Sequence, residues 1–210
     1  MTIETPSSSR RRSYRKRRRA ALEHETRQRI TEAAVKLHGT LGPARTTVSA
    51  IAEEAGVQRA TVYRHFPDTE SLFAACSSHW LAHNPPPDAE RWTQIGDSES
   101  RLRSGLAELY AWYGRTEHML ERINRDATLV PEIAGPLRVR LAYLERVRDL
   151  LLQGRPERGR ARSCVRAAIG HAVAFETWRS LVREQGLDDA EAVELMTRTV
   201  AEAGSLAGRG

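Results

Sequence analysis

The stretch that decides the fold, residues 46–72, reads TTVSAIAEEAGVQRATVYRHFPDTESL. Apolar residues at helical spacing predict a short helix over 48–54, and Thr47 stands where its N-cap is expected. Gly56 can adopt the positive φ that a sharp turn between two helices needs. A second helix of about seven residues is expected from residue 59, before a proline ends it. The pattern is typical of a helix-turn-helix.

The outward face of this second helix is rich in hydrogen-bond donors and carries little negative charge. Such a face fits the major groove of DNA, which is about 12 Å wide. A helix-turn-helix that binds another protein instead is the alternative interpretation. The residues on the outward face are Gln58, Arg59, Ala60, Thr61, Tyr63, Arg64 and His65.

The same stretch resembles the DNA-binding domain of the TetR family of bacterial transcriptional regulators. The resemblance is specific over residues 26–75, and over 90–210 it is one of length and helicity only. Many family members carry a lysine at the start of the fourth helix that contacts a phosphate, whereas this chain has Pro67-Asp68-Thr69 there. The resemblance rests on Thr47, Ile51, Ala52, Ala55, Gly56, Val57, Thr61, Tyr63, Phe66 and Leu72, at the family's spacing.

The resemblance also implies roles for single residues. Thr47 should cap the second helix of the domain and reach a phosphate. Arg59 and Arg64 are the best candidates for a base or phosphate contact, because arginine can pair with guanine through two hydrogen bonds. Ala60 could meet a thymine methyl group. The positions that usually contact the DNA backbone are held by Thr61, Tyr63 and His65.

At the scale of the whole chain, the resemblance implies a homodimer that binds a near-palindromic operator in double-stranded DNA. A small-molecule effector would release a repressor of this kind from the operator. The helices expected at 160–184 and 188–204 would form the dimer, since their broad apolar faces need covering. The identity of the effector and the sequence of the operator do not follow from the resemblance.

Charge is distributed unevenly. The formal net charge is +6, and residues 1–19 hold eight basic side chains against one acid. Residues 20–70 hold six basic and seven acidic groups, so the domain expected to bind DNA is not itself a basic patch. We predict that residues 1–20 form a disordered arm when free, since they are almost without apolar residues. The arm should add salt-sensitive, sequence-independent affinity, with the minor groove as its candidate site. The alternative is that the arm is only a solubilising tail.

Helical periodicity continues to the C-terminus, and no stretch alternates as a strand would. The fold class predicted is therefore all-α. We divide the chain into the basic arm at 1–20, a helix-turn-helix domain at 21–70 and a larger helical domain at 71–210, which would bind the effector and dimerise. The three prolines at 85–87 are the clearest linker.

The effector pocket can be predicted only from residue type. Large or polar side chains stand on otherwise apolar helices of the second domain, and a mostly apolar cavity with a few polar groups is typical of a ligand site. The alternative is that these are ordinary core aromatics. The residues chosen are Trp112, Tyr113, His118, Met119, Asn124, Tyr143, His171, Phe175 and Trp178.

Other kinds of function find less support in the sequence. No enzyme motif is present, so we expect no catalysis and no cofactor, although a helical enzyme with a helix-turn-helix stays open. Cys76, His79 and His83 share a helix face, but three ligands do not complete a closed tetrahedral zinc site, and no metal is expected. No apolar run approaches the roughly 20 residues of a membrane span, and we expect a cytoplasmic protein. The second rival is a ligand-independent architectural protein that binds nucleic acid through the arm.

Overall fold

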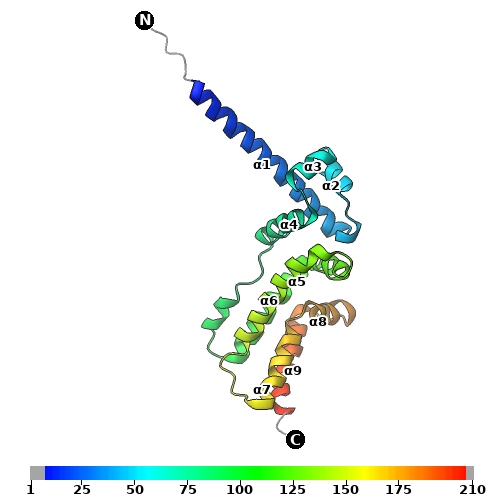
Figure 1. Cartoon of the computed structure of the whole chain (residues 1–210). Helices are drawn as coiled ribbons and strands as arrows, with labels where there is room; N and C mark the ends of the chain where they lie inside the picture. The colour runs from blue at the N-terminus through cyan, green and yellow to red at the C-terminus, as the bar shows by residue number, and fades with distance from the viewer. Residues whose placement is uncertain (1–7, 207–210) are drawn as a thin grey trace. The chain divides into compact units, whose positions relative to one another are not determined.

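The computed structural model describes residues 8–206, and residues 1–7 and 207–210 lie outside the described part. Every regular element in the described part is a helix, and none of its residues forms a strand. The all-α prediction is therefore confirmed (Figure 1). No helix in this part of the chain is long and apolar enough to cross a membrane.

The chain divides into two compact units. The first comprises Met1–His83 with Arg122–Glu132, and the second comprises Asn84–Glu121 with Ile133–Gly210. This division places the boundary after residue 83, whereas the sequence analysis ended the DNA-binding domain at residue 70. The difference arises because Leu72 and Cys76 are buried in the same core as the helix-turn-helix.

The first unit is built around one long helix. Its core contains small and branched apolar residues, among them Ile30, Ala34 and Ile51. Val62 and Phe66 of the helix-turn-helix are buried in the same core. Both α2 and α4 pack against α1, and α3 packs against α2. The helical elements of this unit up to residue 83 are α1 (Ser8–Thr40), η1 (Pro43–Arg45), α2 (Val48–Glu54), α3 (Arg59–His65) and α4 (Thr69–His83).

The first helix differs from the prediction at its N-terminal end. Residues 8–20 continue α1, where a disordered arm was expected through residue 20. Residues 8–38 contain neither proline nor glycine, and arginine, alanine and leucine are good helix formers, so nothing interrupts a helix nucleated in the packed part. The basic segment is thus a helical extension as far as it is described, and residues 1–7 lie outside the described part.

The second unit consists of packed helices and short helical turns. Its core includes Leu102, Leu106 and Leu109 from α5 and Ile169 from α7, all fully buried. The helices α6, α7 and α9 pack on one another in that order. The elements are η2 (Ala89–Gln94), α5 (Ser98–Asp126), η3 (Pro131–Ile133), α6 (Ala134–Leu151), α7 (Gly159–Ala172), α8 (Phe175–Arg179), the π-helical η4 (Ser180–Glu184) and α9 (Asp189–Leu206).

One detail of this unit differs from the sequence analysis. The apolar residues expected to need a dimer partner, such as Val165 and Val200, are already buried within one chain, because α7 and α9 pack against each other.

Candidate nucleic-acid interface

The N-terminus of α2 is capped by Thr47. Its hydroxyl oxygen accepts a hydrogen bond from the backbone N–H of Ala50 at 3.1 Å. The residue is exposed, and its hydroxyl hydrogen is free to donate outward. Thr47 therefore caps the helix and keeps a hydroxyl donor for a further partner.

The turn between α2 and α3 depends on Gly56, which has a φ of +63°. Only glycine adopts this conformation without steric cost. Directly after it, the N–H of Val57 donates to the carbonyl of Ala52 at 2.9 Å and closes the turn. The geometry that the sequence predicted for a helix-turn-helix is present.

The orientation of α3 is fixed from two sides. Val62 and Phe66 are buried, with 1% and 2% of their surface exposed, and tie the helix to the core. At the C-terminal end Arg27 of α1 donates to the carbonyl of His65, and its guanidinium lies 3.9 Å from the centroid of the Phe66 ring. The sequence analysis did not foresee Arg27, because its partners are almost forty residues away in the chain.

The opposite side of α3 is open to solvent. Gln58, Arg59, Ala60, Tyr63 and Arg64 are all exposed. The guanidinium of Arg59 donates to the Tyr63 hydroxyl at 3.0 Å and lies 5.5 Å from the centre of its ring, so the two side chains are held together. Among the described residues, Arg64 makes no hydrogen bond or ion pair, and its donors face solvent.

Two of the predicted contact residues are less accessible. Thr61 and His65 are half-buried. The Nε2 atom of His65 is buried without a hydrogen-bond partner in the described part of the chain. Desolvation, together with the positive charges of Arg64 and Arg27, lowers the pKa of His65, so its imidazole is neutral at physiological pH. His65 therefore offers less to a phosphate than the exposed arginines do.

The start of α4 confirms the departure noted in the sequence. The Asp68 carboxylate accepts a hydrogen bond from the backbone N–H of Ser71 at 2.7 Å, and this bond lowers the pKa of Asp68. An acid thus caps the N-terminus of α4, and Pro67-Asp68-Thr69 supplies no basic side chain there.

The C-terminal end of α5 forms hydrogen bonds with the turn that follows α1. This contact was not predicted from the sequence. The Asp126 carboxylate accepts the Ala44 N–H at 3.0 Å, and Arg125 donates to the Leu41 carbonyl at 3.0 Å. Gly42 has a φ of +93°, and a Cβ atom there would overlap the side chains of Arg125 and Asp126. The glycine was visible in the sequence, but its partner lies more than eighty residues further along.

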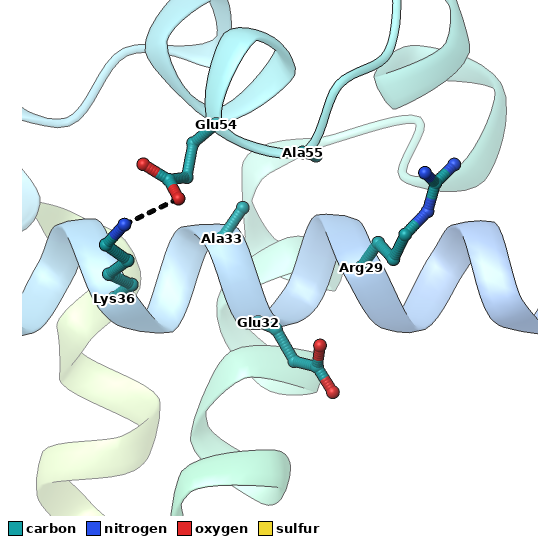
Figure 2. A pocket seen from close by; sticks show the side chains of 6 residues that line it. All are labelled: Arg29, Glu32, Ala33, Lys36, Glu54 and Ala55. Atoms are coloured by element: carbon teal, nitrogen blue, oxygen red, sulfur yellow. Dashed lines mark hydrogen bonds and ion pairs between the residues drawn. The ribbon is translucent and has the colours of Figure 1, made fainter.

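A small pocket lies between α1 and α2, with a volume of about 220 Å³ (Figure 2). Lys36 donates to Glu54 across it at 2.7 Å. Two basic and two acidic side chains line the pocket, so their charges balance and favour no particular ligand charge. The lining residues are Arg29, Glu32, Ala33, Lys36, Glu54 and Ala55.

Some of the residues predicted for the effector site lie together in the second unit. The Tyr113 ring centre lies 5.5 Å from that of Trp112, 5.4 Å from that of Phe175 and 5.9 Å from that of Trp178. The polar atoms of these rings already have partners within the unit: Tyr113 donates to the Val173 carbonyl at 2.5 Å, and Trp178 donates to Asp189 at 2.9 Å. This cluster has the packing of a core.

The other predicted pocket residues are separate from that cluster or near the surface. Tyr143 is half-buried and donates to the Pro87 carbonyl at 2.8 Å. His118 and His171 are exposed, and Met119 is half-buried. Asn124 belongs to the first unit, apart from the others.

The candidate metal ligands on α4 differ in burial. Cys76 is buried, its thiol lies 3.8 Å from the Thr31 carbonyl, and burial raises its pKa to about 12. His79 and His83 pack on each other, with ring centres 4.3 Å apart, and His83 is exposed. In the described part of the chain no three side chains of the metal-binding types form a cluster.

A capped helix, a glycine turn and a second helix with an open arginine-bearing face define the helix-turn-helix class of DNA-binding protein. Residues 30–76 match the family described as "Bacterial regulatory proteins, tetR family". The resemblance seen in the sequence is therefore confirmed for this segment, which is similar to the DNA-binding domain of TetR-family transcriptional regulators. No curated protein matches the chain significantly.

Solved structures share the fold over most of the chain. A TetR-like regulator from Rhodococcus sp. RHA1 has 20% identity and a TM-score of 0.60, and covers 88% of this chain and 97% of its own. A putative TetR-family regulator from Mesorhizobium loti MAFF303099 covers the same shares at 19% identity and a TM-score of 0.58. The regulator FadR from Bacillus subtilis, in complex with stearoyl-CoA, has 18% identity and a TM-score of 0.53, over 84% of this chain and 98% of its own.

Proposed function

We propose that this protein is a dimeric repressor that binds a near-palindromic operator through α3 and leaves it when a small-molecule effector binds the helical second unit. The observation that carries the proposal is the open face of α3. Arg59 and Tyr63 are held together there, Arg64 is unpaired among the described residues, and Val62 anchors the helix from behind.

Each exposed residue has a chemical role in this proposal. Arg59 and Arg64 would donate to base edges or phosphates in the major groove. The Thr47 hydroxyl and the Tyr63 hydroxyl would donate to phosphates on either side, which fixes the register of the helix. Ala60, which is exposed and small, would contact a thymine methyl group. Gln58 supplies an amide that its own helix does not use as a cap.

The proposed response to an effector runs through α5. This helix carries Trp112 and Tyr113, and its last residues belong to the first unit, where Asp126 holds the turn that leads into α2. A ligand that shifts α5 along its axis would therefore change the support of the helix-turn-helix. The stearoyl-CoA bound to the similarly folded FadR favours a small-molecule effector but does not name one for this chain.

An architectural protein that binds DNA without an effector is the second candidate. The structural matches do not favour it, because the fold they share includes the large helical part as well as the DNA-binding segment.

The direct test measures binding of the full-length protein to the DNA upstream of its own coding sequence, by fluorescence anisotropy. A shuffled duplex of the same composition is the control. We expect a preference of at least about 10³-fold for the upstream DNA, the usual lower range for specific regulators. Equal affinity for the two duplexes would refute the proposal.

A further inference from the structure

The N-terminal part of α1 is a strongly basic surface outside the helix-turn-helix core. Every residue from 12 to 25 is exposed, so none of them is needed for packing. Glu23 pairs with Arg19 at 3.1 Å, and the other cations of this stretch are exposed to solvent. The described cations of this segment are Arg12, Arg15, Lys16, Arg17, Arg18 and Arg19. We call residues 12–19 the basic extension.

The position of the extension relative to α3 follows from Arg27. That residue bonds the last carbonyl of α3, so α1 passes beside the C-terminal end of the recognition helix. A helix rises about 1.5 Å per residue, which puts the basic extension about 12–22 Å beyond that point along the axis of α1. Figure 1 shows α1 continuing as one straight helix past α2 and α3.

The residue pattern of the extension fits a polyanion better than a protein groove. Its cations stand on all sides of the helix, and the only large apolar side chains nearby, Tyr14 and Leu22, do not form a stripe. The rest of the first unit lacks such a surface, since residues 20–70 carry one more acid than base and Asp68 holds the start of α4.

We propose that the basic extension is a helical phosphate-binding element that contacts the backbone of double-stranded DNA beside the site read by α3. This rests on the proposed function and adds a second DNA contact to it. The extension acts as a continuation of α1, not as a flexible tail, and it contributes equally at every sequence. DNA carries one negative charge per about 1.7 Å of duplex, so a helix this long meets several phosphates.

The first test removes charge. The triple variant Arg12→Gln/Arg15→Gln/Arg18→Gln is compared with Arg91→Gln/Arg115→Gln/Arg138→Gln, which loses the same charge from exposed positions of the second unit. Binding to the upstream duplex and to the shuffled duplex is measured between about 50 and about 200 mM salt. Each lost phosphate contact lowers the slope of log affinity against log salt by about 0.9. We expect the slope for the first variant to fall by up to about 2.7 units on both duplexes, which changes its affinity relative to the wild-type protein by about 40-fold between the two salt concentrations. The control variant should keep the wild-type slope.

The second test asks whether helical continuity matters. Ala21→Pro keeps every charge but removes the N–H at residue 21 and interrupts α1 between the extension and the core. Ala21→Ser at the same exposed position is the control. The proline variant should lose at least about one unit of salt slope, the equivalent of one phosphate contact, whereas the serine variant should not. Urea unfolding should be the same for all variants, because the changed residues contact no core.

The outcomes separate this inference from the proposed function. Wild-type protein that prefers its upstream duplex, with an unchanged slope in the arginine triple variant, would overturn the inference alone. If the arginine triple variant has a reduced salt slope but Ala21→Pro keeps the wild-type slope, the charges act as a flexible tail. That result would overturn the proposal that the basic extension binds DNA as a helix.

Discussion

Among single residues, His38 links the stability of the first unit to pH. His38 is 5% exposed and stacks on Phe73, with ring centres 4.7 Å apart. Desolvation by burial lowers its pKa to about 4, although the negative charge of Asp126 opposes the shift. The native state therefore keeps this imidazole neutral at pH values where the unfolded chain protonates it.

This shift predicts that stability falls as the pH is lowered from neutral. The contribution of His38 is complete above its unfolded pKa of about 6.5 and is lost progressively as the pH falls toward 4. Between about pH 7 and about pH 5 the wild-type protein should lose roughly 2 kcal/mol of unfolding free energy from this residue. In His38→Phe, which keeps a ring against Phe73, that part of the loss should be absent. Urea unfolding at the two pH values measures the difference, and identical losses in the two proteins would contradict this role.

The sequence alone was enough to predict which face of α3 is buried and which is exposed. Local periodicity was enough to put Val62 inside and Arg59 outside, since both follow from the face of one short helix. Local pattern could not find Arg27 or Asp126, because each acts on a segment far away in the chain. Nor could residue type tell a ligand pocket from a packed cluster: Tyr113 and Trp178 satisfy their polar atoms within the chain, as core aromatics do.

At the scale of elements, the helices whose ends are marked by caps, glycine or proline were predicted closely. The helices α2 and α3 have the expected bounds, because Thr47 and Gly56 define their ends locally. The start of α1 was not predicted, since a segment rich in arginine has the composition of a disordered arm and also the helix propensity to extend a packed helix.

Two glycines with positive φ give a second prediction: Gly42 lies in the turn between α1 and η1, and Gly56 lies in the turn between α2 and α3. Gly42→Ala forces an unfavourable φ of +93° and also drives a Cβ atom into Arg125 and Asp126. Gly56→Ala meets only the conformational cost, because nothing lies within 4 Å of the position of its Cβ. We expect Gly56→Ala to cost about 1 kcal/mol of unfolding free energy and Gly42→Ala clearly more, about 2–4 kcal/mol. Urea denaturation compares them, and equal losses would show that Asp126 and Arg125 do not restrain the turn.

At the scale of the whole molecule, the two compact units correspond to two activities in this account. In the proposed function the first unit would read DNA and the second would sense an effector, and α5 contributes residues to both units. The sequence analysis placed a linker at the three prolines, residues 85–87, and the boundary between the compact units falls close by, after residue 83. The surface that would contact a dimer partner could not be predicted, since the apolar residues of α7 and α9 that indicated it are buried by each other.

In the proposed function α3 reads the DNA sequence through its two exposed arginines, Arg59 and Arg64. This role is tested by the ratio of the affinities for the upstream and the shuffled duplex, measured for the wild-type protein and for Arg59→Ala/Arg64→Ala. Each arginine should contribute about 1–3 kcal/mol of discrimination, so the ratio should fall by about 30-fold or more while the oligomeric state and the unfolding free energy stay unchanged. A double variant that discriminates between the two duplexes as well as the wild-type protein would contradict the account.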